Sequence, residues 1–287
     1  MSGMPIEHRY ETVNGVRLHV ALAGAGPPLV LLHGYPQTWF LWRKVAPLLA
    51  KRFTLIMPDL RGYGDSGKPQ EGYDKRTMAA DIRALAERLG LERFGLVGHD
   101  RGGRVAHRYA LDHGATLAGV SLLDILPTRT VFDTLDREVA LNTWHWLFLP
   151  VPDLAERLIS ADPEAVLRFF LRGWAANPHA IEEAAVEEYL RCFRLPGTIR
   201  ATCADYRAGA TVDLEQDADD EEARIEAPLQ VLWGSHGKLD ARGPLEVWRG
   251  KAASVEGHAL DCGHFLPEED PEQLARALGD FFTPLLA

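Results

Sequence analysis

The segment GHDRGGR at residues 98–104 has the frame of a nucleophile elbow, with an aspartate where a serine usually stands. Asp100 is also acceptable as the cap of a following helix, but three glycines in the segment favour a tight turn. A carboxylate is ionised at neutral pH and attacks without a base. Attack on an acyl carbon would give an anhydride with little gain, whereas attack on a saturated carbon gives a stable ester. Asp100 therefore indicates displacement at carbon, with a halide or an opened epoxide oxygen as the leaving group.

Hydrolysis of such an ester needs a base that activates water, and His264 in DCGHFLPEE is the candidate. It comes late in the chain, which fits the order nucleophile, acid, histidine; an ordinary surface histidine is the alternative. The histidine needs a carboxylate that orients its ring and stabilises its cation. Two candidates stay open, Asp124 at the end of a predicted strand and Asp240 in the loop after the strand at 228–234. Asp124 is favoured, although it is also suited to cap the next helix.

Two further features are predicted to surround the elbow. HGYP follows a buried strand, and the backbone N–H groups of Tyr35 and Arg101 are placed to form an oxyanion hole. Arg101 and Arg104 share one face at the start of a helix, where cations oppose the helix dipole. A bound carboxylate would relieve this repulsion, and the guanidinium fork matches its shape; a protein carboxylate such as Asp59 is the alternative partner. We therefore expect an anionic substrate whose electrophilic carbon is next to its carboxylate.

The predicted elements bring these residues to one edge of a sheet. Buried strands are expected at 28–34, 54–59, 94–99, 117–124 and 228–234, helices at 39–50, 74–90, 101–113 and about 271–286, and a hairpin at 6–23 with its turn at Asn14-Gly15. This alternation predicts an α/β fold, a mostly parallel sheet with helices on both faces. Ligands of such sheets bind at the carboxyl ends of the strands. Residues 127–226 have no buried-strand pattern and many aromatics, so we predict a helical cap there on a core of 1–126 and 227–287.

Composition excludes several classes of protein. The chain has 287 residues, of which 46% are hydrophobic and 25% charged, as is ordinary for a globular core with a lid. Its net charge is -10 and it has no basic run, so nucleic acid is not expected as a partner. An apolar run of the ~20 residues that a membrane span needs is missing, as is an N-terminal signal segment. Three cysteines without a CxxC pair favour a reducing cytoplasm, and the histidine spacings predict no metal site.

Several motifs together resemble one family. GHDRGGRV, HGYPQTWFLW, DLRGYGDS, LLDILPT, TWHWLFL, DYRAGA, VLWG and CGHFLPEE are similar to the fluoroacetate (haloacetate) dehalogenases of the α/β-hydrolase superfamily, over nearly the whole chain. The most specific part is the combination of HDRGGR, DILPT, HW and DYRAGA. The resemblance implies an α/β-hydrolase fold with a helical cap inserted after the strand that ends near residue 124. It also implies a small anionic haloacid as the substrate, no cofactor, and a cytoplasmic homodimer.

The resemblance also assigns the reacting groups. Asp100 falls on the nucleophile of the family, His264 on its base, and Asp124 in DILPT on its acid. Arg101 and Arg104 fall on the arginines that bind the substrate carboxylate. The expected reaction is the conversion of fluoroacetate to glycolate and fluoride through an ester, which water activated by the histidine then hydrolyses.

A second group implied by the resemblance binds the departing halide. His145, Trp146 and Tyr206 fall on the cap residues that hold fluoride, and Trp174 on a tryptophan near the pocket. Imidazole, indole and phenol each offer a donor to this strong acceptor, although core packing is the plainer interpretation of Trp146. Tyr35 occupies a position at which the family usually has a phenylalanine, so it adds a hydroxyl near the pocket.

Other functions stay open. An epoxide hydrolase shares the same nucleophile and base, but it resembles a pattern with tryptophan after the nucleophile and two cap tyrosines that protonate the epoxide oxygen. Here Arg101 follows the nucleophile, and Tyr206 is the obvious tyrosine match. A dehalogenase for other 2-haloacids is a further alternative. A ligand-binding protein on a hydrolase fold is the non-enzyme alternative; loss of a catalytic residue would favour it, and none is lost.

Overall fold

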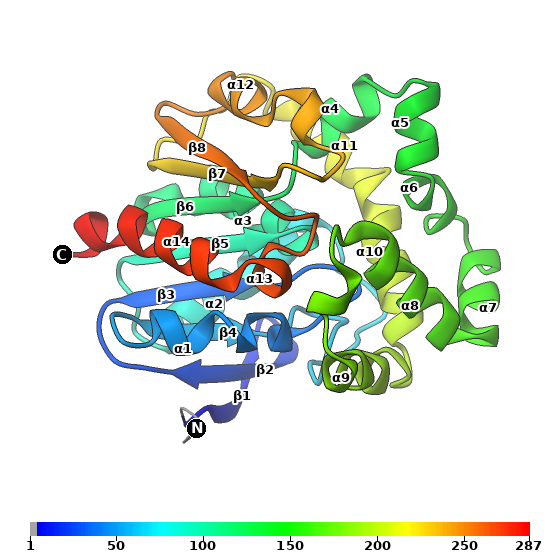
Figure 1. The fold of residues 1–287 in the computed structure, drawn as a ribbon, viewed down its shortest axis with the longest axis horizontal. Coiled ribbons are helices and arrows are strands. Elements are labelled where there is room, and N and C mark those ends of the chain that lie inside the picture. Colours follow the sequence, from blue (N-terminus) through cyan, green and yellow to red (C-terminus); the bar gives the residue numbers. More distant parts are fainter. Residues whose placement is uncertain (1–4) are drawn as a thin grey trace.

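A computed structural model describes residues 5–287 and is built around an eight-stranded sheet (Figure 1). The strand order is β1-β2-β4-β3-β5-β6-β7-β8. The pairs β1–β2 and β2–β4 are antiparallel, and the remaining neighbours are parallel. The strands are β1 (Glu7–Val13), β2 (Val16–Ala23), β3 (Pro28–Leu32), β4 (Thr54–Pro58), β5 (Phe94–His99), β6 (Leu117–Leu123), β7 (Leu229–Gly234) and β8 (Val255–Leu260). The predicted α/β class with a mostly parallel sheet is confirmed.

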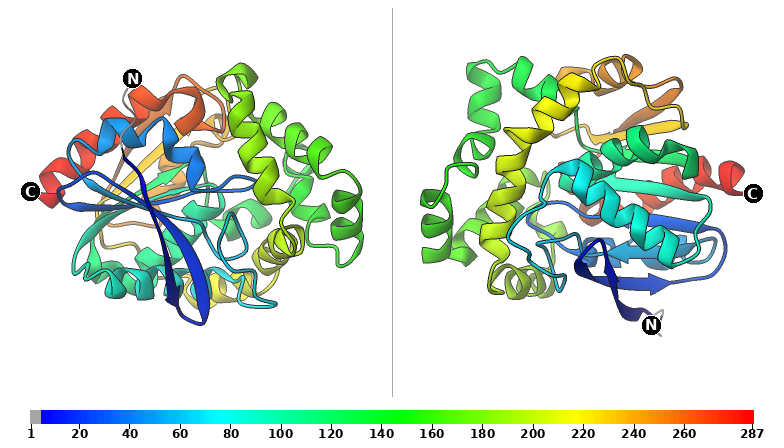
Figure 2. Two further views of the ribbon diagram at one scale, coloured as in Figure 1. Left: turned by 90° about the horizontal axis from the view of Figure 1, so that it is seen from below. Right: turned by 180° about the vertical axis from the view of Figure 1, so that it is seen from behind.

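Helices cover both faces of the sheet (Figure 2). One face carries α2 (Lys75–Arg88), α3 (Arg101–His113) and α12 (Pro244–Arg249), and the other carries α1 (Ala46–Leu49), α13 (Leu266–Glu269) and α14 (Pro271–Leu286). Side chains of β3 alternate between the two layers, because successive residues of a strand point to opposite faces. Val30 and Leu32 belong to the core beneath α2 and α3, whereas Leu29 and Leu31 belong to the core beneath α1 and α14.

Between β6 and β7 the chain forms a layer of helices at one end of the sheet (Figure 1). They are α4 (Thr128–Asp133), α5 (Arg137–Asn142), α6 (His145–Phe148), α7 (Leu154–Ala161), α8 (Pro163–Trp174), α9 (Glu183–Phe193), α10 (Thr198–Gly209) and α11 (Val212–Asp219). This layer, hereafter the cap, lies beside the carboxyl ends of the parallel strands. The division of the chain into two domains at 127–226 stays a prediction.

Most local predictions agree with the structure, and two differ. Asn14 and Gly15 have φ of 46° and 75°, as the predicted two-residue hairpin turn requires. The single helix expected at 39–50 is a 3₁₀ helix (Trp39–Arg43) followed by α1, since Pro47 in the first turn of α1 lacks an N–H. Strand β8 was not predicted because it is a half-exposed edge strand with no continuous apolar run. None of the described helices is long and apolar enough to cross a bilayer.

Candidate active site

The elbow places Asp100 at the junction of β5 and α3. Its φ is 48° and its ψ is -116°, a strained conformation that costs about 1–3 kcal/mol and is typical of functional positions. A Cβ on Gly102 would lie 2.3 Å from the carbonyl oxygen of His33, and one on Gly98 would lie 2.4 Å from that of Gly102. Glycine is therefore needed for the tight turn. The Asp100 side chain makes no capping hydrogen bond to α3, which argues against a purely structural cap.

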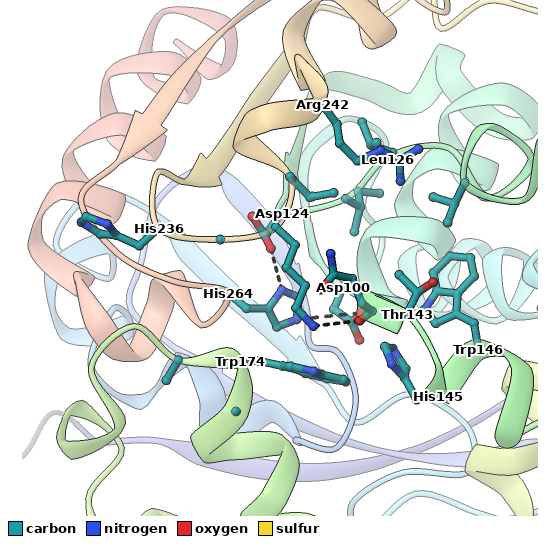
Figure 3. Close-up of a pocket in the computed structure, with 18 of the residues that line it drawn as sticks. Asp100, Asp124, Leu126, Thr143, His145, Trp146, Trp174, His236, Arg242 and His264 are labelled. Atoms are coloured by element: carbon teal, nitrogen blue, oxygen red, sulfur yellow. Dashed lines mark hydrogen bonds and ion pairs between the residues drawn. The ribbon is translucent and has the colours of Figure 1, made fainter. Parts of the chain in front are cut away.

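The carboxylate of Asp100 lies between the backbone N–H of Tyr35 and the imidazole of His264; Figure 3 shows the histidine side of this arrangement. Asp100 Oδ1 accepts a hydrogen bond from the Tyr35 N–H at 2.7 Å, and Oδ2 lies 3.9 Å from His264 Nε2. His264 Nδ1 lies 2.6 Å from Asp124 Oδ2. The second oxygen of Asp124 accepts from the Gly234 N–H at 3.1 Å. One oxygen of Asp100 is thus fixed by the backbone and the other faces the imidazole.

The structure brings Asp124, and not Asp240, to His264. Asp124 follows β6 with a φ of 51°, which turns its carboxylate toward the imidazole. Asp240 instead accepts a hydrogen bond at 2.7 Å from the indole of Trp233, at an exposed position. On the other side, the backbone N–H of His264 donates to the carbonyl of Trp174 in the cap at 3.0 Å. His264 is therefore positioned by both the core and the cap.

The electrostatics of the site favour an ionised Asp100 and a basic His264. Burial raises the pKa of Asp100, but the neighbouring His264, His99 and Arg101 and the Tyr35 N–H together hold it below the usual range. Burial lowers the pKa of His264, but its hydrogen bond and charge interaction with Asp124 outweigh this and raise the pKa. A group with such a carboxylate partner is suited to receive a proton from water.

Arg104 contributes an uncompensated cation to the floor of the site. Its Nη1 donates to the carbonyl of Leu126 at 2.9 Å and to Thr128 Oγ1 at 3.0 Å, both neutral acceptors. Its buried Nε has no partner among the described residues. Burial, with the charge of Arg101 next in size, lowers the pKa of Arg104 to about 10. The guanidinium lies over the Trp146 ring, 4.3 Å from the centroid. An anion bound here would relieve the unfavourable burial of the charge.

Arg101 differs from the expectation that both arginines face the substrate. Its Nε and Nη2 form a two-point ion pair with Asp205 of α10, at 3.0 and 2.7 Å. Asp205 also contacts Lys75 and accepts from the Tyr63 hydroxyl at 2.6 Å. The charge of Arg101 is therefore compensated within the protein, and Arg101 is not part of the cavity wall in the described chain. The two residues share the start of α3, but their guanidinium groups have different surroundings.

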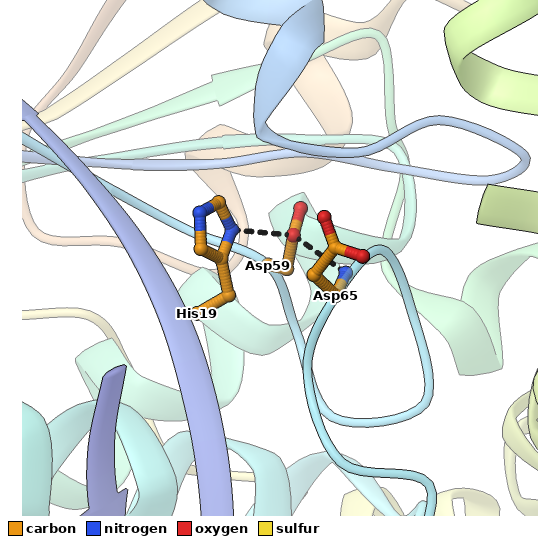
Figure 4. A group of neighbouring side chains, drawn as sticks. All are labelled: His19, Asp59 and Asp65. Atoms are coloured by element: carbon orange, nitrogen blue, oxygen red, sulfur yellow. Dashed lines mark hydrogen bonds and ion pairs between the residues drawn. The ribbon is translucent and has the colours of Figure 1, made fainter. Parts of the chain in front are cut away.

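Asp59, the alternative partner considered for the arginines, belongs to a separate cluster (Figure 4). Its oxygens accept from the N–H groups of Trp39 and Asp65 at 2.8 and 2.9 Å, and it pairs with His19 Nδ1 at 2.8 Å. His19, Asp59 and Asp65 are close enough to share a cation. However, the Asp59 oxygens already have these partners, so we interpret the cluster as support for the loop that follows β4.

The residues predicted to bind halide, and the two other residues predicted near the pocket, fall in different places. Of the predicted halide-binding residues, His145 and Trp146 line the cavity with Asp100, and Tyr206 lies outside the lining defined by the described residues. Of the predicted pocket residues, Trp174 lines the cavity and Tyr35 lies outside it. The hydroxyls of Tyr35 and Tyr206 are nevertheless buried with no hydrogen-bond partner in residues 5–287, and the centroids of the two rings are 5.3 Å apart. Burial lowers the pKa of His145 to about 3 and raises that of Tyr206 well above 10. Both are therefore neutral at pH 7, and the phenol keeps its proton for donation.

A cavity of about 170 Å³ connects Asp100, His145, Trp146 and Trp174 to the surface. Its floor holds Asp100, Arg104, Asp124 and His264, and its mouth lies between the cap and the loop after β7. Mouth residues not singled out from the sequence are Asn142, Thr143, His236, Lys238 and Arg242. Asp205, the partner of Arg101, was also missed from the sequence, and its position before Tyr206 in DYRAGA was the available signal.

Comparison with known proteins identifies the family. The sequence model of one protein family, described as the alpha/beta hydrolase fold, matches residues 27–271 of this chain. The chain belongs to this family. It is 41% identical over 285 residues to a fluoroacetate dehalogenase from Burkholderia sp, covering 96% of this chain and 94% of that protein. It is 42% identical over 285 residues to a soluble epoxide hydrolase from Corynebacterium sp. (strain C12), covering 98% of each. The structure of the epoxide hydrolase CorEH without ligand matches with a TM-score of 0.93 at 42% identity, over 98% of this chain and 100% of that one.

These matches confirm the α/β-hydrolase fold and the resemblance to fluoroacetate dehalogenase, and they support a hydrolase. A dehalogenase and an epoxide hydrolase match this hydrolase about equally well. The choice between carbon–halide and epoxide substrates therefore depends on the chemistry of the site.

Proposed function

We propose that the protein is a haloacid dehalogenase that displaces halide from 2-haloacids, with haloacetates such as fluoroacetate as its substrates. The observation that carries the proposal is Arg104, a buried cation with neutral partners on the floor of a cavity that also contains Asp100. A simple epoxide offers no anion for this cation. A haloacid offers a carboxylate adjacent to the carbon that is attacked.

In the first half-reaction, Asp100 Oδ2 attacks the carbon that bears the halogen. The new C–O bond forms as the carbon–halogen bond breaks, and the halide leaves with the bonding electron pair. The low pKa of Asp100 keeps the nucleophile ionised without help from a base. Arg104 holds the substrate carboxylate beside the nucleophile, which aligns the carbon for attack. The product of this step is an ester of Asp100.

In the second half-reaction, His264 Nε2 takes a proton from water, and the resulting hydroxide attacks Cγ of the ester. Charge develops on Oδ1, the oxygen to which the Tyr35 N–H already donates at 2.7 Å. Asp124 stabilises the imidazolium through the 2.6 Å contact to Nδ1. Collapse expels the 2-hydroxyacid, whose oxygen takes the proton from His264. Asp100 keeps the oxygen of the water, and its carboxyl group releases the remaining proton to solvent, which restores the carboxylate.

The leaving halide is assigned to neutral donors on the cap side of the cavity. His145 Nδ1 and the Tyr206 hydroxyl are buried without partners in the described chain, and Trp146 lines the cavity together with His145. Fluoride concentrates charge on a small ion, so donors in a closed, dry site stabilise it as it forms. The ring of Tyr206 lies beside that of His145, with 5.8 Å between the centroids.

The proposal is tested by measuring halide release from chloroacetate, fluoroacetate and 2-chloropropionate beside hydrolysis of a terminal epoxide. Halide release at a rate well above that of epoxide opening is expected, and Asp100→Asn should abolish it. Epoxide hydrolysis with no halide release from any of the acids would contradict the proposal.

Epoxide hydrolysis is the second candidate, and one observation favours it. Ring opening needs a proton donor on the epoxide oxygen, and the hydroxyls of Tyr35 and Tyr206 form a buried pair with no partner among residues 5–287. The role of Tyr35 separates the two candidates. Tyr35→Phe should leave haloacetate turnover nearly unchanged if dehalogenation is the activity, and should strongly slow ring opening if the epoxide is the substrate.

We also infer that two copies of the chain pair through the cap. Large apolar side chains are exposed on neighbouring cap helices, among them Leu147 at 46%, Leu154 at 52%, Leu158 at 54% and Phe169 at 57%. An exposed apolar group of this kind favours a protein interface. A symmetric contact between copies would bury the same surface on both.

A further inference from the structure

Two cations line the mouth of the cavity and have no assigned role. Lys238 and Arg242 follow β7 in the segment GSHGKLDAR, and both side chains contribute to the cavity wall. No carboxylate of residues 5–287 lies within the 4.0 Å that defines an ion pair with either group. Figure 3 shows Arg242 on the β7 side of the cavity, with Trp174 and His145 on the cap side.

The contacts of these cations leave their charges uncompensated. Lys238 Nζ donates to the backbone carbonyl of Asn142 at 2.7 Å, and Arg242 Nη2 donates to the hydroxyl of Thr134. Both acceptors are neutral, so they satisfy one donor of each cation without balancing its charge. Lys238 is exposed and Arg242 half-buried; partial burial lowers the pKa of both, and the nearby Asp136 offsets part of this for Arg242. A bound anion would stabilise both groups.

The charge of the cavity wall is opposite to that of the protein. Three cations line the cavity, Arg104, Lys238 and Arg242, against two carboxylates, Asp100 and Asp124. With histidines neutral the lining therefore sums to +1, whereas the whole chain carries -10. Since Arg104 lies at the floor and the other two cations lie at the mouth, the positive charge occupies both ends of the cavity.

The cavity also has more room than a haloacetate fills. A closed apolar cavity of roughly 150 Å³ binds benzene, and the cavity of about 170 Å³ opens to solvent beyond that volume. The carboxylate of a two-carbon acid bound at Arg104 would leave the mouth unfilled. A longer substrate with a second anionic group would occupy both ends.

We propose that Lys238 and Arg242 form a second anion subsite, which binds the distal carboxylate of a dicarboxylic 2-haloacid while Arg104 binds the carboxylate next to the reacting carbon. The identity of the reaction rests on the proposed function, whereas the subsite rests on the geometry of the mouth. The subsite adds a substrate class to the haloacetates of the proposed function, namely dicarboxylic acids with a halogen on the carbon beside one carboxylate, such as 2-chlorosuccinate.

The alternative for Lys238 and Arg242 is a purely structural role, in which they hold the loop after β7 against the cap. Their hydrogen bonds to Asn142 and Thr134 both join that loop to the cap. Such a role predicts that loss of either cation weakens the protein or its binding of all ligands to a similar extent. A subsite predicts a selective loss of dicarboxylate binding. The ratio of dicarboxylate to monocarboxylate affinity therefore separates the two roles.

The experiment measures binding of unreactive acids by calorimetry in low-salt buffer free of carboxylates. The ligands are propionate, malonate, succinate and glutarate. At least one dicarboxylate should bind about tenfold or more tightly than propionate, as one additional charged hydrogen bond implies. Lys238→Met and Arg242→Gln should each remove most of that difference and leave propionate binding unchanged. Lys51→Met, which removes an exposed lysine outside the cavity, is the matched control and should change neither.

The subsite is overturned if no dicarboxylate binds more tightly than propionate, or if the two variants weaken all four acids equally. Because calorimetry needs no turnover, this result is independent of catalysis. The reactive arm compares kcat/KM for 2-chlorosuccinate and 2-chloropropionate in the same proteins, and the preference for the diacid should disappear in the variants. Selective dicarboxylate binding without halide release from any haloacid would support the subsite and contradict the proposed dehalogenase.

Discussion

Replacing Arg104 by Met should damage the use of anionic substrates far more than neutral ones. Nη1 of Arg104 is occupied by Leu126 and Thr128, whereas the buried Nε has no partner in the described chain. Nε and Nη2 are therefore free to make a two-point contact with a carboxylate. A hydrogen bond to a charged group contributes about 1.5–3 kcal/mol. Taking about 3 kcal/mol for the pair, kcat/KM for chloroacetate should fall by roughly two decades.

The assay compares chloroacetate with chloroacetamide, which keeps the leaving group and loses the negative charge. Arg104→Met should reduce kcat/KM for chloroacetate by roughly a hundredfold and change that for chloroacetamide little. The matched control is the double variant Arg101→Met, Asp205→Asn, which removes the compensated ion pair from the same helix start, while the buried Lys75 keeps Asp213 as a partner at 3.6 Å. It should change the two substrates by similar factors.

Two results would refute this interpretation of the arginines. Equal losses on chloroacetate and chloroacetamide in Arg104→Met would show that Arg104 does not bind the substrate carboxylate. A larger loss of kcat/KM for chloroacetate, relative to chloroacetamide, in the Arg101 double variant than in Arg104→Met would show that Arg101 leaves Asp205 and binds the substrate carboxylate.

Three other predictions concern the acid, the halide donors and assembly. Asp124→Asn should slow steady-state turnover by at least tenfold and lower the apparent pKa of its pH profile, because Asp124 raises the pKa of His264. Asp240→Asn should change neither the turnover nor the apparent pKa. A larger effect of Asp240→Asn than of Asp124→Asn would assign Asp240 as the acid. Tyr206→Phe should slow single-turnover defluorination by one to two decades, about 1.5–3 kcal/mol, and dechlorination much less; parallel losses would indicate a role in pocket shape. Leu158→Glu should convert a dimer to a monomer in sedimentation, and an unchanged mass would contradict pairing through the cap.

The features that were predictable from the sequence are those fixed by neighbours in the chain. The hairpin follows from Asn14-Gly15, and the elbow follows from glycines around Asp100 that a tight strand-to-helix turn requires. The buried strands follow from continuous apolar runs, because both faces of a parallel sheet are covered. The position of His264 beside Asp124 was anticipated partly by chain order and partly by the family resemblance.

The features that were not predictable depend on contacts between distant segments. Arg101 pairs with Asp205, which lies 104 residues further along the chain. The spacing of Arg101 and Arg104 does not indicate which of the two forms this ion pair. Lys238 and Arg242 become wall residues only because the cap packs over the loop after β7. Strand β8 lacks an apolar run because it is a half-exposed edge strand. Each of these depends on tertiary packing rather than on local pattern.

The most direct test of the covalent mechanism is mass spectrometry of the intact His264→Gln protein after mixing with chloroacetate. Alkylation should still occur, because Asp100 is ionised without a base, and hydrolysis should stop. The adduct should accumulate on the peptide that contains Asp100, at a rate set by the ionisation of that carboxyl, whose pKa is still lowered by His99, Arg101 and the Tyr35 N–H when His264 is replaced. Wild-type turnover should instead rise with pH through the raised pKa of His264, because the neutral imidazole is the base. An inactive but folded variant that carries no adduct would contradict the covalent mechanism.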